Sequence, residues 1–161
     1  MSRLKQSDSI VIKELKVAAY TIPTDAPESD GPIKCDSTTL VLIEINAGGK
    51  TGLGYSYTDV SSAFFIEKNL KKLVEGKNAV DIPLIAESMV HSVRNDGNCG
   101  VVSMAISAVD NALWDLKAKL LDLPLISILG KVRDDFQIYG SGGFTSYSID
   151  RLQKQLGGWA D

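Results

Sequence analysis

The stretch from residue 105 to residue 130, AISAVDNALWDLKAKLLDLPLISILG, decides how the chain folds. Alanines recur in it at helical spacing beside a second stripe of larger apolar residues. This pattern is typical of a helix packed closely on two sides, and we expect the helix to run from about Val101 to Leu121. Pro124 to Leu129 predict a short second helix, which Gly130 ends.

Two acids, Asp110 and Asp115, lie within this apolar helix. They are five residues apart and so about 140° apart around the helix, which prevents them from converging on one substrate atom. Lys119 follows Asp115 at the spacing of a helical ion pair. We therefore expect structural roles for both acids rather than paired-carboxylate catalysis.

The region before the helix predicts strands. Residues 9–21 favour a strand. Its apolar residues are first even-numbered and then odd-numbered, which indicates two half-segments or a bulge within the strand. Residues 38–57 favour a hairpin that turns at Gly48 and Gly49 and ends near Tyr57. Between them, residues 22–37 hold three prolines and four acids with little periodicity, which predicts an irregular segment, either a functional lid or a disordered loop.

After Tyr57 the apolar period changes from two to about 3.6 residues. We expect Asp59 to cap a helix that Gly76 ends, and Asp81 to open another with Pro83 in its first turn. Their expected apolar faces are Val60, Phe64, Leu70, Leu73 and Val74 on the first helix, and Ile82, Ile85, Ala86, Met89, Val90 and Val93 on the second. Strands followed by helices predict an α+β fold.

The C-terminal residues depart from this order. Residues 136–144, FQIYGSGGF, predict a strand with a glycine-rich exit, and residues 148–159 predict a helix behind it. A parallel strand needs neighbouring strands and covering helices. We therefore expect one domain over residues 1–130 and, over residues 131–161, the first βα unit of a truncated second domain.

Composition excludes several classes of protein. The 161 residues are 44% hydrophobic and carry a net charge of −3 without a long run of either sign, which disfavours nucleic acid and membrane surfaces as partners. Cys35 and Cys99 match no metal-ligand spacing, and the N-terminus shows no apolar signal segment. A reducing cytoplasm is the expected compartment. No apolar run approaches the roughly 20 residues of a membrane span.

Glycine-rich and histidine motifs add no further chemistry. Residues 47–52, AGGKTG, lack the first glycine of a phosphate-binding loop, and residues 140–145, GSGGFT, lack the third glycine of a dinucleotide fingerprint. His91 has no cysteine or acid at ligand spacing. None of these motifs predicts a metal ligand or a catalytic residue.

The opening stretch also carries a resemblance. It is similar to the N-terminal signature of the mandelate racemase/muconate lactonizing enzyme family, in the enolase superfamily. The matching residues are Ala105, Ser107, Ala108, Val109, Asp110, Ala112, Leu113, Asp115, Leu116, Ala118, Lys119, Pro124, Leu125, Ile128, Leu129 and Gly130.

The resemblance implies a fold and a chemistry. The fold is a three-stranded antiparallel sheet followed by a helical bundle, the capping domain, and then a (β/α) or TIM barrel whose first strand falls at residues 136–144. The chemistry is abstraction of the proton α to a carboxylate, with Mg²⁺ stabilising the enediolate. Racemisation, cycloisomerisation or loss of water follows. The full-length protein is therefore expected to be an isomerase or a lyase, acting on a sugar-derived acid as a dehydratase or epimerase.

In this family the Lys-x-Lys base, the acidic metal ligands and a His-Asp dyad lie on later barrel strands, which this chain does not hold. The 161-residue chain alone is therefore expected to be a fragment that is inactive and binds no Mg²⁺. We expect a small-molecule carboxylate as partner and a homo-oligomer as the assembled state.

The resemblance also implies which residues shape the pocket. In the family, the loop after the first strand and the loop that ends the hairpin close over the barrel mouth, and here they correspond to residues 22–36 and 54–59. The expected substrate-binding residues are Thr24, Asp25, Tyr55, Tyr57 and Thr58. Ordinary strand pairing accounts equally well for the two tyrosines. The alternative function is a non-catalytic, stand-alone α+β module that binds a partner through an unpaired strand.

Overall fold

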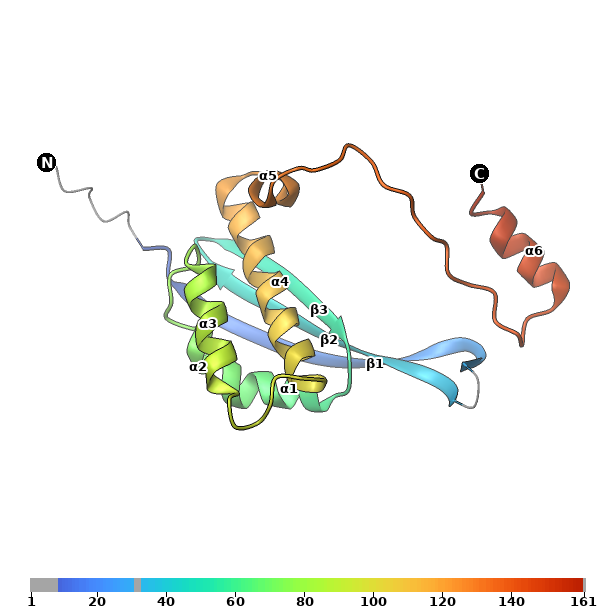
Figure 1. The fold of residues 1–161 in the computed structure, drawn as a ribbon, viewed down its shortest axis with the longest axis horizontal. Coiled ribbons are helices and arrows are strands. Elements are labelled where there is room, and N and C mark those ends of the chain that lie inside the picture. Colours follow the sequence, from blue (N-terminus) through green and yellow to red (C-terminus); the bar gives the residue numbers. More distant parts are fainter. Residues whose placement is uncertain (1–8, 31–32, 161) are drawn as a thin grey trace, which may run out of the picture. The chain divides into compact units, whose positions relative to one another are not determined.

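The computed structural model describes residues 9–30 and 33–160. Three strands form one antiparallel sheet in the order β1 (Ile12–Asp30), β2 (Ile33–Ala47) and β3 (Lys50–Tyr57) (Figure 1). The helical elements follow in the chain: α1 (Ser61–Phe65), the π-helical turn η1 (Ile66–Leu70), α2 (Lys71–Val74), α3 (Ile82–Ser92), α4 (Val101–Leu121), α5 (Leu125–Leu129) and α6 (Ile149–Gly157). This order confirms the predicted α+β class of sheet followed by helices.

The hairpin of β2 and β3 forms as predicted. Its strands pair antiparallel from Leu40 opposite Tyr57 to Ala47 opposite Lys50. Gly48 and Gly49 make the turn with φ of +56° and +75°. A two-residue turn with positive φ at both positions matches the twist of the flanking strands, and glycine adopts it at little steric cost.

The expectation of an irregular segment over residues 22–37 is wrong. β1 continues to Asp30 and β2 begins at Ile33, so the described residues of this segment lie in strands, and residues 31–32 lie outside the described part of the chain. We call residues 21–38 the hairpin arm. Pro23 and Pro27 lie on β1, which is an edge strand of the sheet, and edge strands are where sheets tolerate proline. Residues 34–38 are exposed, so burial imposes no alternation there that the sequence could reveal.

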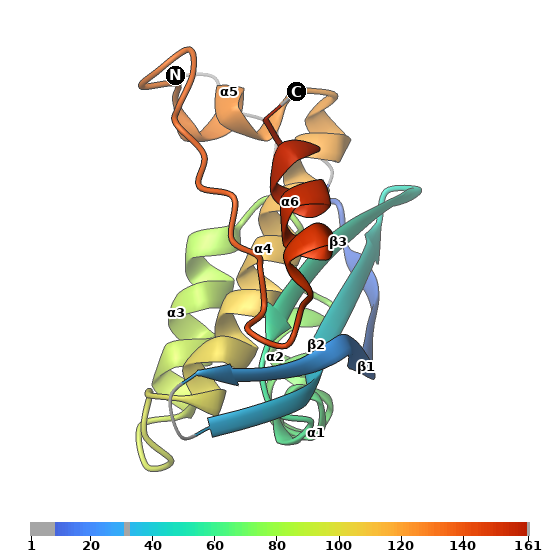
Figure 2. The same cartoon turned by 90° about the vertical axis from the view of Figure 1, so that its right-hand side faces the viewer.

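The core lies between one face of the sheet and the helices. Val41, Ile43 and Ile45 alternate along β2 and are fully buried. Figures 1 and 2 show α3 and α4 side by side over this face. On β1, Ile12 and Leu15 are both buried although they differ in parity, as the predicted parity change requires.

The predicted inner faces of two helices are partly wrong. Val60 and Phe64 at the first helical segment, and Val90 on α3, are exposed rather than buried. The buried positions of the first segment recur at an interval of four: Ser62, Ile66, Leu70 and Val74. The π-helical turn explains this interval, because it takes more residues per turn than an α-helix and keeps this stripe facing inward.

The later helices follow their predicted bounds. α4 begins at Val101 and ends at Leu121, and α5 ends before Gly130, whose φ is +90°. α6 also forms within its predicted range. The strand expected over residues 136–144 is not formed, and none of the residues 131–148 lies in a strand. Phe136, Ile138 and Tyr139 are exposed, because no neighbouring strand pairs with this segment or covers its faces.

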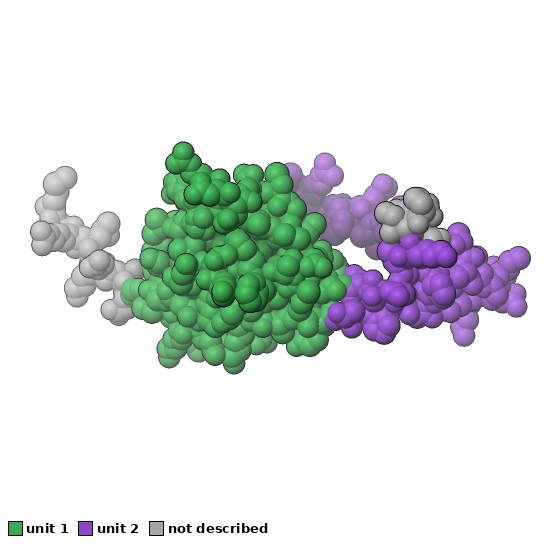
Figure 3. All heavy atoms as spheres, turned by 90° about the horizontal axis from the view of Figure 1, so that it is seen from below, with its two compact units in different colours: residues 1–20, 39–130 green, residues 21–38, 131–161 purple. Residues whose placement is uncertain are grey.

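The chain divides into two compact units. Unit 1 comprises residues 1–20 and 39–130, and unit 2 comprises residues 21–38 and 131–161 (Figure 3). Strands β1 and β2 therefore each contribute residues to both units. Among the residues that the structure describes, no helix is long and apolar enough to cross a membrane.

Candidate functional site

The close contact between β3 and α4 determines where the two predicted tyrosines lie. A Cβ atom added at Gly52 would lie 2.2 Å from the Ala112 carbonyl oxygen, and one added at Gly54 would lie 2.2 Å from that of Ala108. Atoms that are not bonded to each other do not approach this closely, so a side chain at either glycine would force the strand and the helix apart. The alanine stripe of α4 therefore packs directly on the β3 backbone, and both partners must be small.

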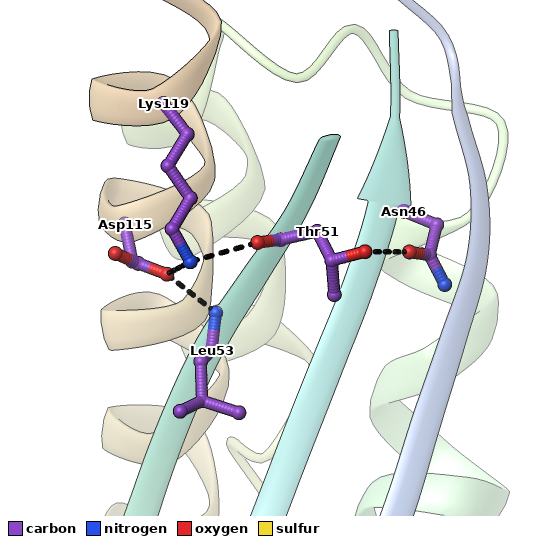
Figure 4. A network of polar contacts seen from close by, with 5 residues as sticks. All are labelled: Asn46, Thr51, Leu53, Asp115 and Lys119. Atoms are coloured by element: carbon purple, nitrogen blue, oxygen red, sulfur yellow. Dashed lines mark hydrogen bonds and ion pairs between the residues drawn. The ribbon is translucent and has the colours of Figure 1, made fainter. Parts of the chain in front are cut away.

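Asp115 ties the same two elements together through polar contacts. Its Oδ2 accepts hydrogen bonds from the Leu53 backbone N–H at 2.7 Å and from Lys119 Nζ at 2.7 Å (Figure 4). Lys119 Nζ also donates to the Thr51 carbonyl oxygen at 2.9 Å, and Thr51 Oγ1 donates to Asn46 Oδ1 at 2.6 Å. The structural role predicted for Asp115, including its ion pair with Lys119, is confirmed.

Asp110 is half-buried on α4. Burial raises the pKa of its carboxyl group, and a hydrogen bond with the Trp114 side chain opposes that rise. Lys117 Nζ lies 5.3 Å from the centroid of the Trp114 ring and donates to the Val80 carbonyl oxygen at 3.0 Å. Asp110 thus belongs to contacts along the helix itself, which fits the structural role expected of it.

Tyr55 and Tyr57 project from β3 on one side of the strand, and both are more than half exposed. Their rings meet edge to face with centroids 6.0 Å apart. Thr58, just after the strand, is half-buried, and its Oγ1 lies 2.9 Å from Ser62 Oγ. The tyrosine side chains are therefore accessible to a ligand, whereas the Thr58 hydroxyl already has a partner at the start of α1.

A pocket of about 440 Å³ opens beside Tyr55 within unit 1. Its volume lies in the range of small-molecule sites. β3, α4 and α5 supply its walls, through Leu53, Gly54, Tyr55, Asn111, Trp114, Asp115, Leu125 and Leu129. Tyr55 is thus the one predicted site residue on this pocket wall.

Thr24 and Asp25 lie on the hairpin arm, in unit 2. Asp25 Oδ1 accepts a hydrogen bond from the Tyr147 hydroxyl at 2.7 Å, and Oδ2 forms an ion pair with the Arg151 guanidinium. Both carboxylate oxygens are therefore engaged. Thr24 is half-buried. The other three predicted residues, Tyr55, Tyr57 and Thr58, belong to unit 1.

A second pocket, of about 470 Å³, lies within unit 2 between the hairpin arm and the turn before α6. Charged, sulfur-bearing and hydroxyl side chains line it: Pro27, Glu28, Lys34, Cys35, Asp36, Thr145 and Ser146. Sequence reasoning missed Glu28 and Lys34. The sequence offers one signal for this pocket, a single lysine among the four acids of residues 22–37. A segment expected to be irregular gives no strand register, so the sequence does not predict which of these side chains lie together.

The described residues do not form a metal centre. They contain no group of three or more His, Cys, Asp or Glu side chains placed to hold an ion. A magnesium ion prefers several oxygen ligands in octahedral geometry, so the donor set of these residues does not fit one.

Comparison with known proteins gives both a family and a fold. Residues 16–130 match the family described as mandelate racemase / muconate lactonizing enzyme, N-terminal domain. A mandelate racemase/muconate lactonizing enzyme-like protein from Rubrobacter xylanophilus is 53% identical, with a TM-score of 0.86 over 93% of this chain and 42% of its own. A racemase from Streptomyces coelicolor A3(2), solved with bound magnesium, is 29% identical, with a TM-score of 0.84 over 93% of this chain and 44% of its own.

An L-talarate/galactarate dehydratase from Salmonella typhimurium LT2, liganded with Mg and L-lyxarohydroxamate, is also similar. It is 29% identical, with a TM-score of 0.79 over 97% of this chain and 43% of its own. The chain thus spans 42–44% of the length of these three proteins. From the sheet and helices of unit 1 and the match over residues 16–130, the chain belongs to the mandelate racemase/muconate lactonizing enzyme family of the enolase superfamily, with the fold of its N-terminal domain.

Proposed function

We propose that this chain is the substrate-capping part of an enolase-superfamily enzyme that removes the proton α to a carboxylate. The family match to an N-terminal domain, in a chain that spans less than half of its solved relatives, carries this proposal. Residues 1–130 are then the capping domain, and residues 131–161 are the first βα unit of a barrel. The later barrel units would supply the base and the ligands of Mg²⁺, which stabilises developing negative charge when bound.

A sugar-derived acid is the proposed substrate, and its dehydration or epimerisation the proposed reaction. The relatives solved with magnesium include a racemase and a sugar-acid dehydratase, which supports this class. On this chain, the accessible hydroxyls of Tyr55 and Tyr57 suit a polyhydroxylated ligand. The cytoplasmic location and the homo-oligomeric state stay predictions.

The test uses the longest protein that the gene encodes. It is incubated in D₂O with Mg²⁺ and a panel of aldarates and aldonates, and NMR follows the α proton. We expect exchange or dehydration of at least one acid, loss of the reaction on chelation of the metal, and no reaction by the 161-residue chain alone. A full-length protein that leaves every acid unchanged contradicts the proposal.

Site residues are tested in the same assay. Tyr57→Phe is expected to lower kcat/KM by about tenfold, because one hydrogen bond to substrate is lost. Tyr20→Phe is the matched control, since Tyr20 is an exposed tyrosine on β1 outside the proposed site. Equal kcat/KM values for the two variants would show that Tyr57 does not bind the substrate, and they would leave the proposed reaction unaffected.

A non-catalytic binding module is the second candidate. β1 and β3 are the edge strands of the sheet, and an exposed edge can pair with a partner's strand. The α-proton assay separates the two candidates, because a binding module turns over no acid in any form of the protein.

A further inference from the structure

The hairpin arm is held by a segment more than a hundred residues away in the chain. Within unit 2, Tyr147 and Arg151 both contact Asp25, and Ser146 Oγ donates a hydrogen bond to the Pro27 carbonyl oxygen at 2.6 Å. The sequence separation in each contact is at least 119 residues. Closing such a loop costs conformational entropy, so several contacts must act together to hold it.

Tyr147 is the centre of these contacts. Among the residues of unit 2 whose exposure is described, it alone is buried, at 9% exposure. Its ring packs against Phe144 with centroids 5.1 Å apart, and the Arg151 guanidinium carbon lies 3.7 Å from the ring centroid. An exposed ion pair such as Arg151 with Asp25 contributes little alone. We therefore expect the partly buried hydrogen bond from Tyr147 to Asp25 and the packing of the Tyr147 ring to contribute more to the clasp.

The segment that carries Tyr147 is itself held in shape. Gln155 Oε1 on α6 accepts a hydrogen bond from the Gly143 N–H at 3.0 Å, and Ser148 Oγ accepts one from Arg151 N–H at 3.3 Å. Trp159 packs so closely on Gly142 that a Cβ there would lie 2.2 Å from its ring. These contacts tie the turn that carries Tyr147 to helix α6, which carries Arg151.

We infer that Asp25 is a positioning residue, which forms a clasp with Tyr147 and Arg151 that orders the hairpin arm. Within the clasp, one carboxylate oxygen of Asp25 accepts from the Tyr147 hydroxyl and the other pairs with the Arg151 guanidinium, so the role assigned to Asp25 is to hold the arm. The arm supplies Pro27, Glu28 and Lys34 to the unit 2 pocket, so the clasp sets the shape of that pocket wall. The inference concerns the order of the arm and does not depend on the activity proposed above.

The charges around Tyr147 make the clasp sensitive to alkaline pH. Its hydroxyl donates to the Asp25 carboxylate, which raises the pKa of the phenol, and burial and the nearby Glu28 carboxylate raise it further. The Arg151 guanidinium opposes this rise. A raised folded-state pKa means that the contribution of the clasp is complete below the ordinary tyrosine pKa. It is lost as pH rises through the raised value, because the phenolate cannot donate to a carboxylate.

The first experiment measures hydrogen exchange in the 161-residue chain at pH 7. Asp25→Asn and Tyr147→Phe are expected to speed exchange of the arm amides by about tenfold, while the β3 amides of unit 1 keep their rates. Asp36→Asn and Tyr139→Phe are the controls. Asp36 lies on the same arm and accepts a hydrogen bond from its neighbour Ser37, and Tyr139 is 91% exposed. Arm rates equal to those of the controls, or an equal acceleration in β3, would overturn the clasp.

The second experiment reads the pH dependence directly. Cys35 on the arm is exposed, and in a Cys99→Ser background it accepts a nitroxide label whose electron paramagnetic resonance spectrum reports local motion. We expect the label to become mobile above the ordinary pKa of tyrosine in the parent protein, with no such step in Tyr147→Phe. A step of the same size and midpoint in both proteins would overturn the inference even if Asp25→Asn proved unstable.

Discussion

Asp115 shows how a single carboxylate joins a helix to a strand. It accepts a backbone N–H from Leu53 and an ammonium from Lys119, which also binds the Thr51 carbonyl oxygen. The helical spacing of Asp115 and Lys119 predicts their ion pair from the sequence alone. The bond to Leu53 depends on how β3 is placed against α4, which no local pattern encodes.

Asp115→Ala is expected to lower the free energy of unfolding by about 1–2 kcal/mol, because it leaves the Leu53 N–H and the Lys119 ammonium without their shared acceptor. Urea denaturation followed by circular dichroism measures this change. Glu87→Ala, at an exposed acid on α3, is the control and should stay within about 0.5 kcal/mol. If the two variants lose similar amounts of unfolding free energy, the contacts of Asp115 stabilise the fold no more than an exposed surface acid does.

Asp110 gives a pH-dependent prediction. Burial raises the pKa of its carboxyl group in the folded protein, so the folded state binds this proton more tightly than the unfolded state does. Its contribution to stability therefore falls as pH rises from the unfolded to the folded pKa. The Asn side chain stays neutral at every pH. The unfolding free energy of Asp110→Asn minus that of the parent protein should therefore be more positive at pH 7 than at pH 3. Urea midpoints at both pH values measure the gain, and a constant difference would contradict it.

At the scale of elements, the β3–α4 contact is the tightest constraint in unit 1. Alanines on the helix meet glycines on the strand, so the two backbones approach more closely than ordinary side chains allow. Helix α4 forms where the sequence predicts it, because a long periodic pattern bounded by turn residues is a strong local signal. Which residues of β3 must be glycine follows only from the packed structure.

Gly54→Ala tests this contact. The added methyl group would lie 2.2 Å from the Ala108 carbonyl oxygen, and we expect a loss of about 3 kcal/mol or more in unfolding free energy. Gly157→Ala on α6 is the matched control, since nothing lies within 4 Å of its added Cβ, and its effect should stay within about 0.5 kcal/mol. Thermal unfolding monitored by circular dichroism compares them. A tolerated Gly54→Ala would mean that α4 can withdraw from the strand at little cost.

The hairpin arm and residues 136–144 show where sequence patterns fail for strands. The arm is formed of strands although its exposed faces and its prolines hide any alternation. Residues 136–144 have an apolar, strand-like pattern, yet they remain unpaired, because strand formation needs partners that no local pattern supplies. The same limit applies to the unit 2 pocket, whose walls come from two distant segments.

At the scale of the whole molecule, apolar burial is concentrated in unit 1. The core cluster draws on β1, β2 and the helices from Ile66 to Leu116, all within residues 12–116. Unit 2 contributes only Tyr147 to the buried apolar residues that the structure describes. Because burial of apolar surface is the dominant favourable contribution to folding, unit 1 holds most of the stability.

A chain that ends at Gly130 is therefore expected to fold. It keeps the whole core cluster, so its unfolding free energy should fall by less than about 1 kcal/mol, and its transition should remain cooperative. Urea denaturation of the shortened and the 161-residue proteins measures both quantities. A loss of cooperativity on shortening would show that the C-terminal segment belongs to the folding nucleus of unit 1.

The two strands that run through both units constrain how this family can vary in sequence. The hairpin arm begins after Tyr20 and ends before Thr39, and both of its strands continue into unit 1. Adding one residue to a single strand reverses the facing of every side chain beyond it. Related proteins are therefore expected to lengthen or shorten the arm by matched residues on both strands, because only paired changes preserve the register of the core.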